Sequence, residues 1–136
     1  MASEASSSGR EGPENAVDAV APGAKCSNAT LDGTYLFAYD GVQIQGNNRE
    51  PFATAGYQVH DDIDKVRGRY SANFNGQIFN NEPFRGKYTV NANCTGTATF
   101  KDAQYDLFIA PDGSMFTFVQ TDTEYVTSGT AQRVGP

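Results

Sequence analysis

The chain has 136 residues, with 10 Lys and Arg against 16 Asp and Glu, and carries a formal charge of −6 at pH 7. A chain of this length forms one small domain. The acidic balance argues against nucleic acid as a partner, because binding along a phosphate backbone requires clustered Lys and Arg. The longest apolar runs, such as 115–119, are far shorter than the roughly 20 residues that cross a bilayer, so no membrane span is expected.

The first 25 residues differ in composition from the rest of the chain. They are rich in Ala, Ser, Gly, Glu and Pro and contain no aromatic residue. Such a segment buries too little apolar surface to offset the entropy lost on ordering. We therefore predict a disordered tail over 1–25 and a folded domain over 26–136. A second interpretation makes 16–21 a short amphipathic lid over a binding cavity. Charged residues such as Glu4 and Arg10 interrupt any secretory signal, which predicts a cytoplasmic protein as written.

The chain has two cysteines, Cys26 at the start of the predicted domain and Cys94 in a predicted turn. A disulfide between them would tie the entry of the chain to a hairpin near its middle. Two free thiols in a reducing compartment fit the sequence equally well. Acceptor triplets for glycosylation begin at Asn28 and Asn93, and with a disulfide they would indicate a secreted protein. No metal site is expected, since His60 is the only histidine that could join the cysteines.

From residue 31 onward, apolar and polar residues alternate, and Tyr, Phe, Val and Thr dominate. Alternation is typical of strands, and no long helix is predicted. The predicted strands are 33–40, 52–60, 64–75, 84–91, 95–101, 104–110, 114–121 and 125–134. The predicted turns, which contain Asn, Asp, Gly or Pro, are 80–83, 92–94 and 111–113. The segment 41–51 is predicted to be a longer loop.

Short sequential hairpins favour a meander, and eight such strands close most economically into a barrel without exposed edges. The predicted fold is therefore all-β, a small eight-stranded antiparallel meander barrel, with a two-sheet sandwich as the alternative.

Alternation also assigns the faces of the strands. The predicted inward sets are Tyr35, Phe37 and Tyr39; Ala53, Ala55, Tyr57 and Val59; Val66, Gly68, Tyr70, Ala72 and Phe74; and Phe84, Gly86, Tyr88 and Val90. The cations predicted on the solvated exterior are Lys65, Arg67, Arg69, Arg85 and Lys87. Two strands are ambiguous, because Tyr105, Leu107 and Ile109 compete with Phe108, and Phe116, Phe118 and Gln120 compete with Met115 and Val119.

The interior of an eight-stranded barrel is just wide enough to be filled by side chains or to hold one small ligand. Both interpretations stay open at the level of the sequence. In the second, the lining would comprise Tyr35, Phe37, Tyr57, Phe74, Phe84, Phe100, Tyr105, Phe116 and Phe118. The polar groups predicted to act on a substrate are Tyr39, Tyr70, Tyr88 and Gln120. Such a pocket suits a hydrophobic, partly oxygenated small molecule.

Signatures of other chemistry are weak. His60 lies where a strand meets a turn, and we interpret it as a solvent-exposed side chain rather than a general base. No second constellation supplies a triad, and the single glycines lack the strand-to-helix context of a phosphate loop. The sequence therefore predicts no cofactor, no metal and no covalent nucleophile.

Three segments resemble a group of small, mostly uncharacterised bacterial proteins: LDGTYLF at 31–37, FRGKYTVNANCTGTATF at 84–100 and SGTA at 128–131. The resemblance covers about residues 26–134, and it implies secretion, because members of the group usually begin with a secretion signal. In architecture alone, the predicted barrel is similar to the calycin-type barrels of allene oxide cyclase, dirigent proteins and spirotetronate cyclase. This similarity implies a cavity that folds a reactive apolar substrate without metal or nucleotide.

Three functions follow as hypotheses. The first is a cofactor-independent cyclase or isomerase acting on a polyene or polyketide-like molecule. The second is a lipocalin-like carrier that holds an apolar ligand without changing it. The third is a secreted interaction module whose barrel is fully packed. The protein is expected to be a monomer or a homodimer.

Overall fold

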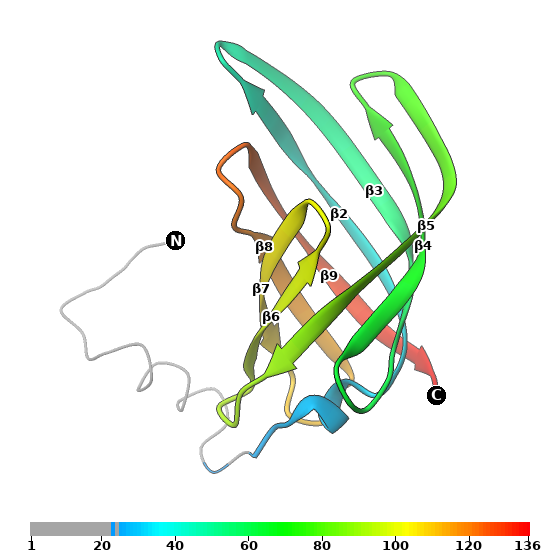
Figure 1. Ribbon diagram of the computed structural model, residues 1–136, viewed down its shortest axis with the longest axis vertical. Helices are drawn as coiled ribbons and strands as arrows, with labels where there is room; N and C mark the ends of the chain where they lie inside the picture. The colour runs from blue at the N-terminus through cyan, green and yellow to red at the C-terminus, as the bar shows by residue number, and fades with distance from the viewer. Residues whose placement is uncertain (1–22, 24) are drawn as a thin grey trace, which may run out of the picture.

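The computed structural model describes Gly23 and residues 25–136. Eight antiparallel strands follow one another in sequence order around a closed barrel (Figure 1). They are β2 (Gly33–Gln45), β3 (Asn48–His60), β4 (Lys65–Phe74), β5 (Gln77–Val90), β6 (Thr95–Phe100), β7 (Ala103–Ile109), β8 (Met115–Gln120) and β9 (Tyr125–Gly135). The predicted meander barrel is confirmed, and the sandwich is excluded because β9 pairs with β2. In the described part of the chain, no helix is long and apolar enough to cross a membrane. Most of the predicted tail, and the whole of the lid predicted over 16–21, lie outside the described residues.

The first hairpin is longer than the sequence predicted. The loop predicted over 41–51 is wrong, because β2 and β3 stay paired from Gly33 and His60 up to Gln45 and Asn48. Gly46 adopts a φ of 60° at the tip, a conformation that glycine reaches without steric cost. The polar residues of this segment therefore extend a twisted hairpin beyond the rest of the barrel (Figure 1).

The turn predicted over 80–83 is also wrong, since these residues belong to β5. The register between β4 and β5 shifts between Tyr70 and Ala72, which marks a β-bulge. Asn81 adopts a φ of 52° at this point, and its backbone N–H donates to Ser71 Oγ at 3.0 Å. Asn tolerates the left-handed conformation, so residues that favour a turn produce a bulge inside a strand.

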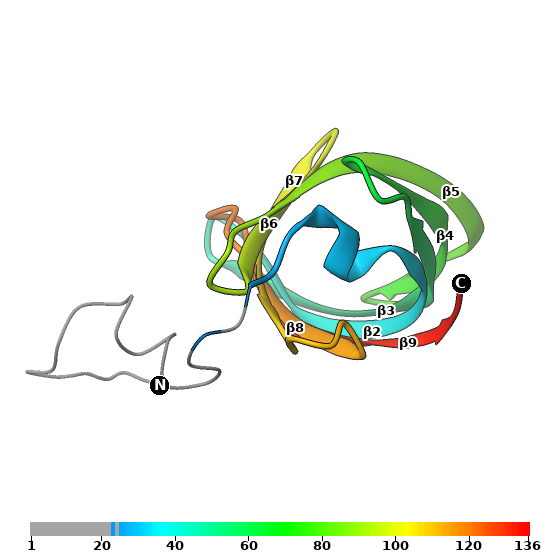
Figure 2. The same cartoon turned by 90° about the horizontal axis from the view of Figure 1, so that it is seen from below.

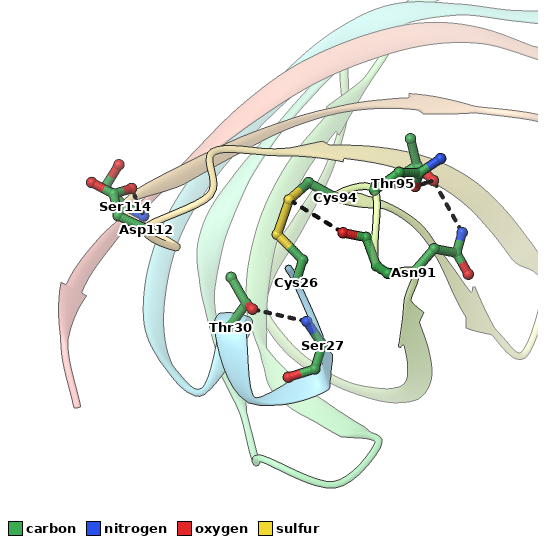
Figure 3. The surroundings of a disulfide bond; sticks show 10 residues. Cys26, Ser27, Thr30, Asn91, Cys94, Thr95, Asp112 and Ser114 are labelled. Atoms are coloured by element: carbon green, nitrogen blue, oxygen red, sulfur yellow. Dashed lines mark hydrogen bonds between the residues drawn. A yellow bond between two sulfur atoms is a disulfide. The ribbon is translucent and has the colours of Figure 1, made fainter. Parts of the chain in front are cut away.

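One end of the barrel is closed by the 3₁₀ helix η1 (Asn28–Leu31), which lies across the opening seen in Figure 2. Leu31 is fully buried there. Val90 donates its backbone N–H to Asn28 Oδ1 at 2.7 Å, which ties η1 to β5. Cys26 and Cys94 form a disulfide beside η1, with Cα atoms 5.1 Å apart (Figure 3). The structure thus selects the disulfide over two free thiols.

The predicted inward faces are correct on β2, β4 and β5 and wrong on β3. On β3 the inward set is Phe52, Thr54, Gly56, Gln58 and His60, while Ala53, Ala55, Tyr57 and Val59 face outward. Tyr57 is 40% exposed and does not line the interior. The error arises because β3 carries apolar residues on both faces, so alternation alone does not orient it. On β7 and β8 the inward residues are Tyr105, Leu107 and Ile109, then Phe116, Phe118 and Gln120.

Candidate functional site

The interior has two layers, and the lower one, next to η1, is closely packed. Its aromatic side chains are Tyr35, His60, Tyr88 and Phe116. The centroid of the His60 ring lies 5.3 Å from that of Tyr35 and 4.7 Å from that of Tyr88. Arg133 closes this layer from β9, donating hydrogen bonds to the backbone carbonyls of Thr30, Asp32 and Gly113. The lower layer therefore belongs to the core and offers no route to a ligand.

Tyr88, predicted to act on a substrate, is fixed in this lower layer. It is 2% exposed, and its hydroxyl lies within hydrogen-bonding distance of the backbone carbonyls of Asn28, at 3.0 Å, and Asp61. Burial and the neighbouring carboxylates, Asp61 first, raise the pKa of this phenol. Tyr35, predicted to line the site, is held in the same way, because its hydroxyl donates to the Gly113 carbonyl. Both phenols fasten η1 and the adjoining turns to the barrel wall.

His60 is a core residue, which corrects its interpretation as a solvent-exposed side chain. It is 1% exposed, and burial lowers its pKa to about 4, with a smaller contribution from the Arg133 charge. The imidazole is therefore neutral at pH 7, and its Nε2 lies 2.7 Å from Gln58 Nε2. The inward orientation of His60 was predictable from Phe52, because the two residues are an even number of positions apart and therefore lie on the same side of β3.

The upper layer lies toward the opposite end, where the β2–β3 and β4–β5 hairpins extend past the short β6 and β7 (Figure 1). We call its inward-facing rings the aromatic mouth: Phe37, Tyr39, Phe52, Tyr70, Phe74, Phe84, Phe100, Tyr105 and Phe118. Neighbouring rings contact one another at centroid distances such as 4.9 Å for Phe52 and Phe74 and 5.5 Å for Phe84 and Phe100. Several of these rings are only half-buried.

Polar groups meet among these rings. The Tyr105 hydroxyl donates to the Tyr39 hydroxyl oxygen at 3.2 Å. Gln120 lies directly opposite Tyr105 in the β7–β8 register, and its Nε2 donates to Asp122 Oδ2 at 2.9 Å. Burial, followed by the neighbouring Tyr39, raises the pKa of Tyr105 well above its ordinary value. The structure thus brings Tyr39 and Gln120 together around Tyr105, which was predicted to line the site.

Two further inward-facing hydroxyls, on Thr54 and Thr127, were not predicted from the sequence. Thr54 and Thr127 are 6% and 5% exposed, and neither hydroxyl has a hydrogen-bond partner among the described residues. Thr54 is the register partner of Tyr39, and Thr127 is that of Gly41, so both flank β2 in the upper layer. Inward-facing threonines give no sequence signal of their own, since Thr is also common on solvated strand faces.

Tyr70 lies in the same layer on β4, and its ring centroid is 6.1 Å from that of Phe84. Burial and then the Glu82 charge raise the pKa of its phenol, so it also stays protonated at neutral pH. Of the four polar residues predicted to act on a substrate, Tyr39, Tyr70 and Gln120 belong to the upper layer, and Tyr88 does not.

Two concave regions of the described surface lie on the outside of the barrel. One has a volume of about 640 Å³ over β2, β3, β4 and β9, and the other about 340 Å³ over β7, β8 and β9. The larger is lined mainly by small outward-facing side chains, such as Ala38, Ala55 and Ser71. These hollows follow the curvature of a sheet with small side chains and carry no cluster of reactive groups.

No protein-family model matches this chain, and a search of curated proteins finds no relative. The fold and the upper layer nevertheless define a class: a small closed antiparallel barrel with one plugged end and an aromatic opposite end.

Proposed function

We propose that the aromatic mouth binds a hydrophobic, partly oxygenated small molecule and promotes its cyclisation or isomerisation without a cofactor. The observation that supports this most directly is the Tyr105–Tyr39 hydroxyl pair beside Gln120, surrounded by half-buried rings. Aromatic walls with a few placed polar groups are typical of sites for apolar small molecules.

The hydroxyl pair has a direction that suits donation to a ligand. Tyr105 donates to the Tyr39 oxygen, which leaves the Tyr39 hydrogen free for a carbonyl oxygen of the substrate. A phenol that accepts one hydrogen bond becomes a better donor of the next. Because the pKa values of Tyr105 and Tyr70 are raised, both phenols stay protonated and do not act as bases.

A reaction that suits such a site needs no external proton acceptor. The rings would hold a flexible apolar chain with its reacting carbons close together, and the donor from Tyr39 would polarise a conjugated carbonyl. Bonds then form and break within one molecule, so the product has the mass of the substrate.

The experiment that tests this proposal exposes the purified protein to an apolar metabolite extract of its source organism. Bound and free compounds are compared by mass and chromatographic retention, with heat-denatured protein as the control. A compound converted to one of equal mass and new retention, only with folded protein, supports a cyclase or isomerase. No capture at all contradicts the proposal and favours the packed interaction module.

A carrier without catalysis is the second candidate. It is favoured by the hydrogen bonds that the polar groups already make, since the Gln120 amide is bonded to Asp122 and the Tyr105 hydrogen to Tyr39. A site in which these two donors are already satisfied holds an apolar ligand chiefly by burial. In the same experiment, a carrier retains a compound and releases it unchanged.

We also infer that the protein works in an oxidising compartment, which modifies the cytoplasmic location expected from its first residues. The support is the Cys26–Cys94 disulfide, because such bonds persist mainly in secreted and periplasmic proteins. Thiol labelling of the protein isolated from its native cells checks this inference, and labelled Cys26 or Cys94 would contradict it.

A further inference from the structure

A cluster of positive charge lies on the outer face of two neighbouring strands, away from the aromatic mouth. We call it the basic face: Lys65, Arg67 and Arg69 on β4, with Arg85 and Lys87 on β5. All five side chains are exposed. The basic face thus carries five of the chain's 10 cationic side chains, although the whole chain is acidic.

The register places like charges directly against each other. Lys65 is the partner of Lys87, and Arg67 is the partner of Arg85. Like charges opposite one another on adjacent strands destabilise a sheet. The fold accepts this cost twice in succession, which indicates that the cations serve something other than stability.

Few groups neutralise the basic face. The one ion pair between described side chains joins Lys65 to Asp64, at 3.2 Å and largely exposed. Arg69 donates to the Asn81 carbonyl at 2.8 Å, which orients the guanidinium without neutralising it. The register partners on the flanking strands carry no charge, since Val59 faces Arg67 and Thr99 faces Lys87.

Exposed apolar side chains adjoin the cations. Leu36 pairs with Tyr57, and Tyr57 pairs with Arg69, so the three form one row across β2, β3 and β4. Leu36 is 54% exposed and Tyr57 is 40% exposed. Tyr57, which does not line the interior, therefore presents an amphipathic ring beside a guanidinium.

We propose that the basic face, with Leu36 and Tyr57, binds the surface of a membrane that contains anionic phospholipids. Guanidinium groups match phosphate oxygens in pairs, and tyrosine rings favour the level of the lipid headgroups. Two adjacent strands on the outside of a barrel can touch a plane together, so long cationic side chains from both reach it. The exposed Leu36 and Tyr57 favour a bilayer over a polyanion free in water, because the interfacial region of a membrane also accepts apolar side chains.

The net charge of −6 does not prevent this contact. At physiological ionic strength, charges farther away than about 8 Å are largely screened, so the near face dominates the interaction. Each Lys or Arg near an anionic membrane contributes about 1 kcal/mol of attraction, which corresponds to about a five-fold change in binding.

Sedimentation with vesicles tests the proposal. The full chain, with its disulfide intact, is mixed with vesicles of phosphatidylcholine alone and with vesicles that also contain phosphatidylglycerol. Binding is expected only to the second kind, and it should weaken as salt is added. Arg67→Gln and Arg85→Gln should each weaken binding about five-fold. Arg49→Gln, the same charge change on the β2–β3 hairpin, is the matched control and should have little effect.

Folding of the variants is checked by thermal unfolding. Arg67→Gln and Arg85→Gln each relieve one like-charge pair, so their Tm should equal or exceed that of the parent protein. Equal binding to neutral and anionic vesicles, no binding to either, or an equal loss with Arg49→Gln would each overturn the proposal. Binding to a soluble acidic polysaccharide, with none to anionic vesicles, would assign the basic face to that class of partner instead.

Discussion

Single hydroxyl groups distinguish the two layers of the interior. In the lower layer, the hydroxyls of Tyr35 and Tyr88 donate hydrogen bonds to backbone carbonyls of the segments that close the barrel. In the upper layer, Tyr39 and Tyr105 bond to each other and leave one hydrogen free. The same residue type thus bonds to the backbone at one end and to another side chain at the other.

The free hydrogen of Tyr39 leads to the first prediction. Tyr39→Phe should lower turnover of the substrate on the order of tenfold or more while changing KM little, because the lost hydrogen bond acts on the reacting carbonyl. Steady-state kinetics on a substrate found in the extract experiment measures both constants. Tyr57→Phe is the matched control and should behave as the parent protein, since that ring faces outward. Equal kinetics in all three proteins would remove Tyr39 from the mechanism.

The burial of His60 makes stability depend on pH, which is the second prediction. Its pKa is about 4 in the folded protein against 6.5 ordinarily, so between these values the unfolded chain binds a proton that the folded one does not. The free energy of unfolding should therefore fall by about 3 kcal/mol as pH drops from about 6.5 to about 4, and His60 adds no further loss below that.

Urea unfolding at a series of pH values measures this fall. The His60→Phe variant separates the histidine from carboxylates that titrate near the lower limit, because it should lose the slope between about pH 6.5 and 5. The same slope in the variant and the parent protein would contradict the assignment of this loss to His60.

At the scale of strands, the alternation of residue types predicted most of the barrel. It succeeded where one face is clearly polar, as on β4, whose outward residues include Lys65 and Arg67. It failed on β3, where small apolar residues line a hollow of the outer surface and Thr54 faces the core. It also failed at residues 80–83, where turn-forming residues shape a bulge rather than end a strand.

That bulge gives the third prediction. Asn81 has a φ of 52°, which costs a β-branched residue on the order of 1–2 kcal/mol. Asn81→Val should therefore destabilise the protein by about that amount, while Asn81→Gly should change stability little. Thermal unfolding monitors both variants, and Asn80→Val, one position earlier in the same strand, is the control. Equal effects of the valine at 80 and at 81 would show that backbone conformation is not the cause.

At the scale of the whole molecule, the candidate site was predictable in composition but not in arrangement. Aromatic residues at alternate positions identified much of the interior, and Tyr39, Tyr70 and Gln120 all face inward in the upper layer. Which end would be plugged was not predictable, because it depends on η1 folding across the barrel and on contacts such as Val90 to Asn28, 62 residues apart in the sequence. Those contacts assign Tyr88 to the core and the mouth to the opposite end.

The 3₁₀ helix η1, which closes the lower end of the barrel, lies next to one long-range covalent link, the Cys26–Cys94 disulfide. This link gives the last prediction. The disulfide joins residues 68 positions apart, and closing a loop of that size stabilises the fold by about 4 kcal/mol. The double variant Cys26→Ala/Cys94→Ala should lose about that much in urea unfolding, and reductant should lower the parent protein equally while leaving the variant unchanged. Because η1 begins two residues after Cys26, the variant should also expose Leu31. The backbone amide of Leu31 should then exchange hydrogen faster than that of Phe118 in the upper layer. Retained stability together with unchanged exchange at Leu31 would mean that the hydrogen bonds of Asn28 and Arg133 hold the plug without the disulfide.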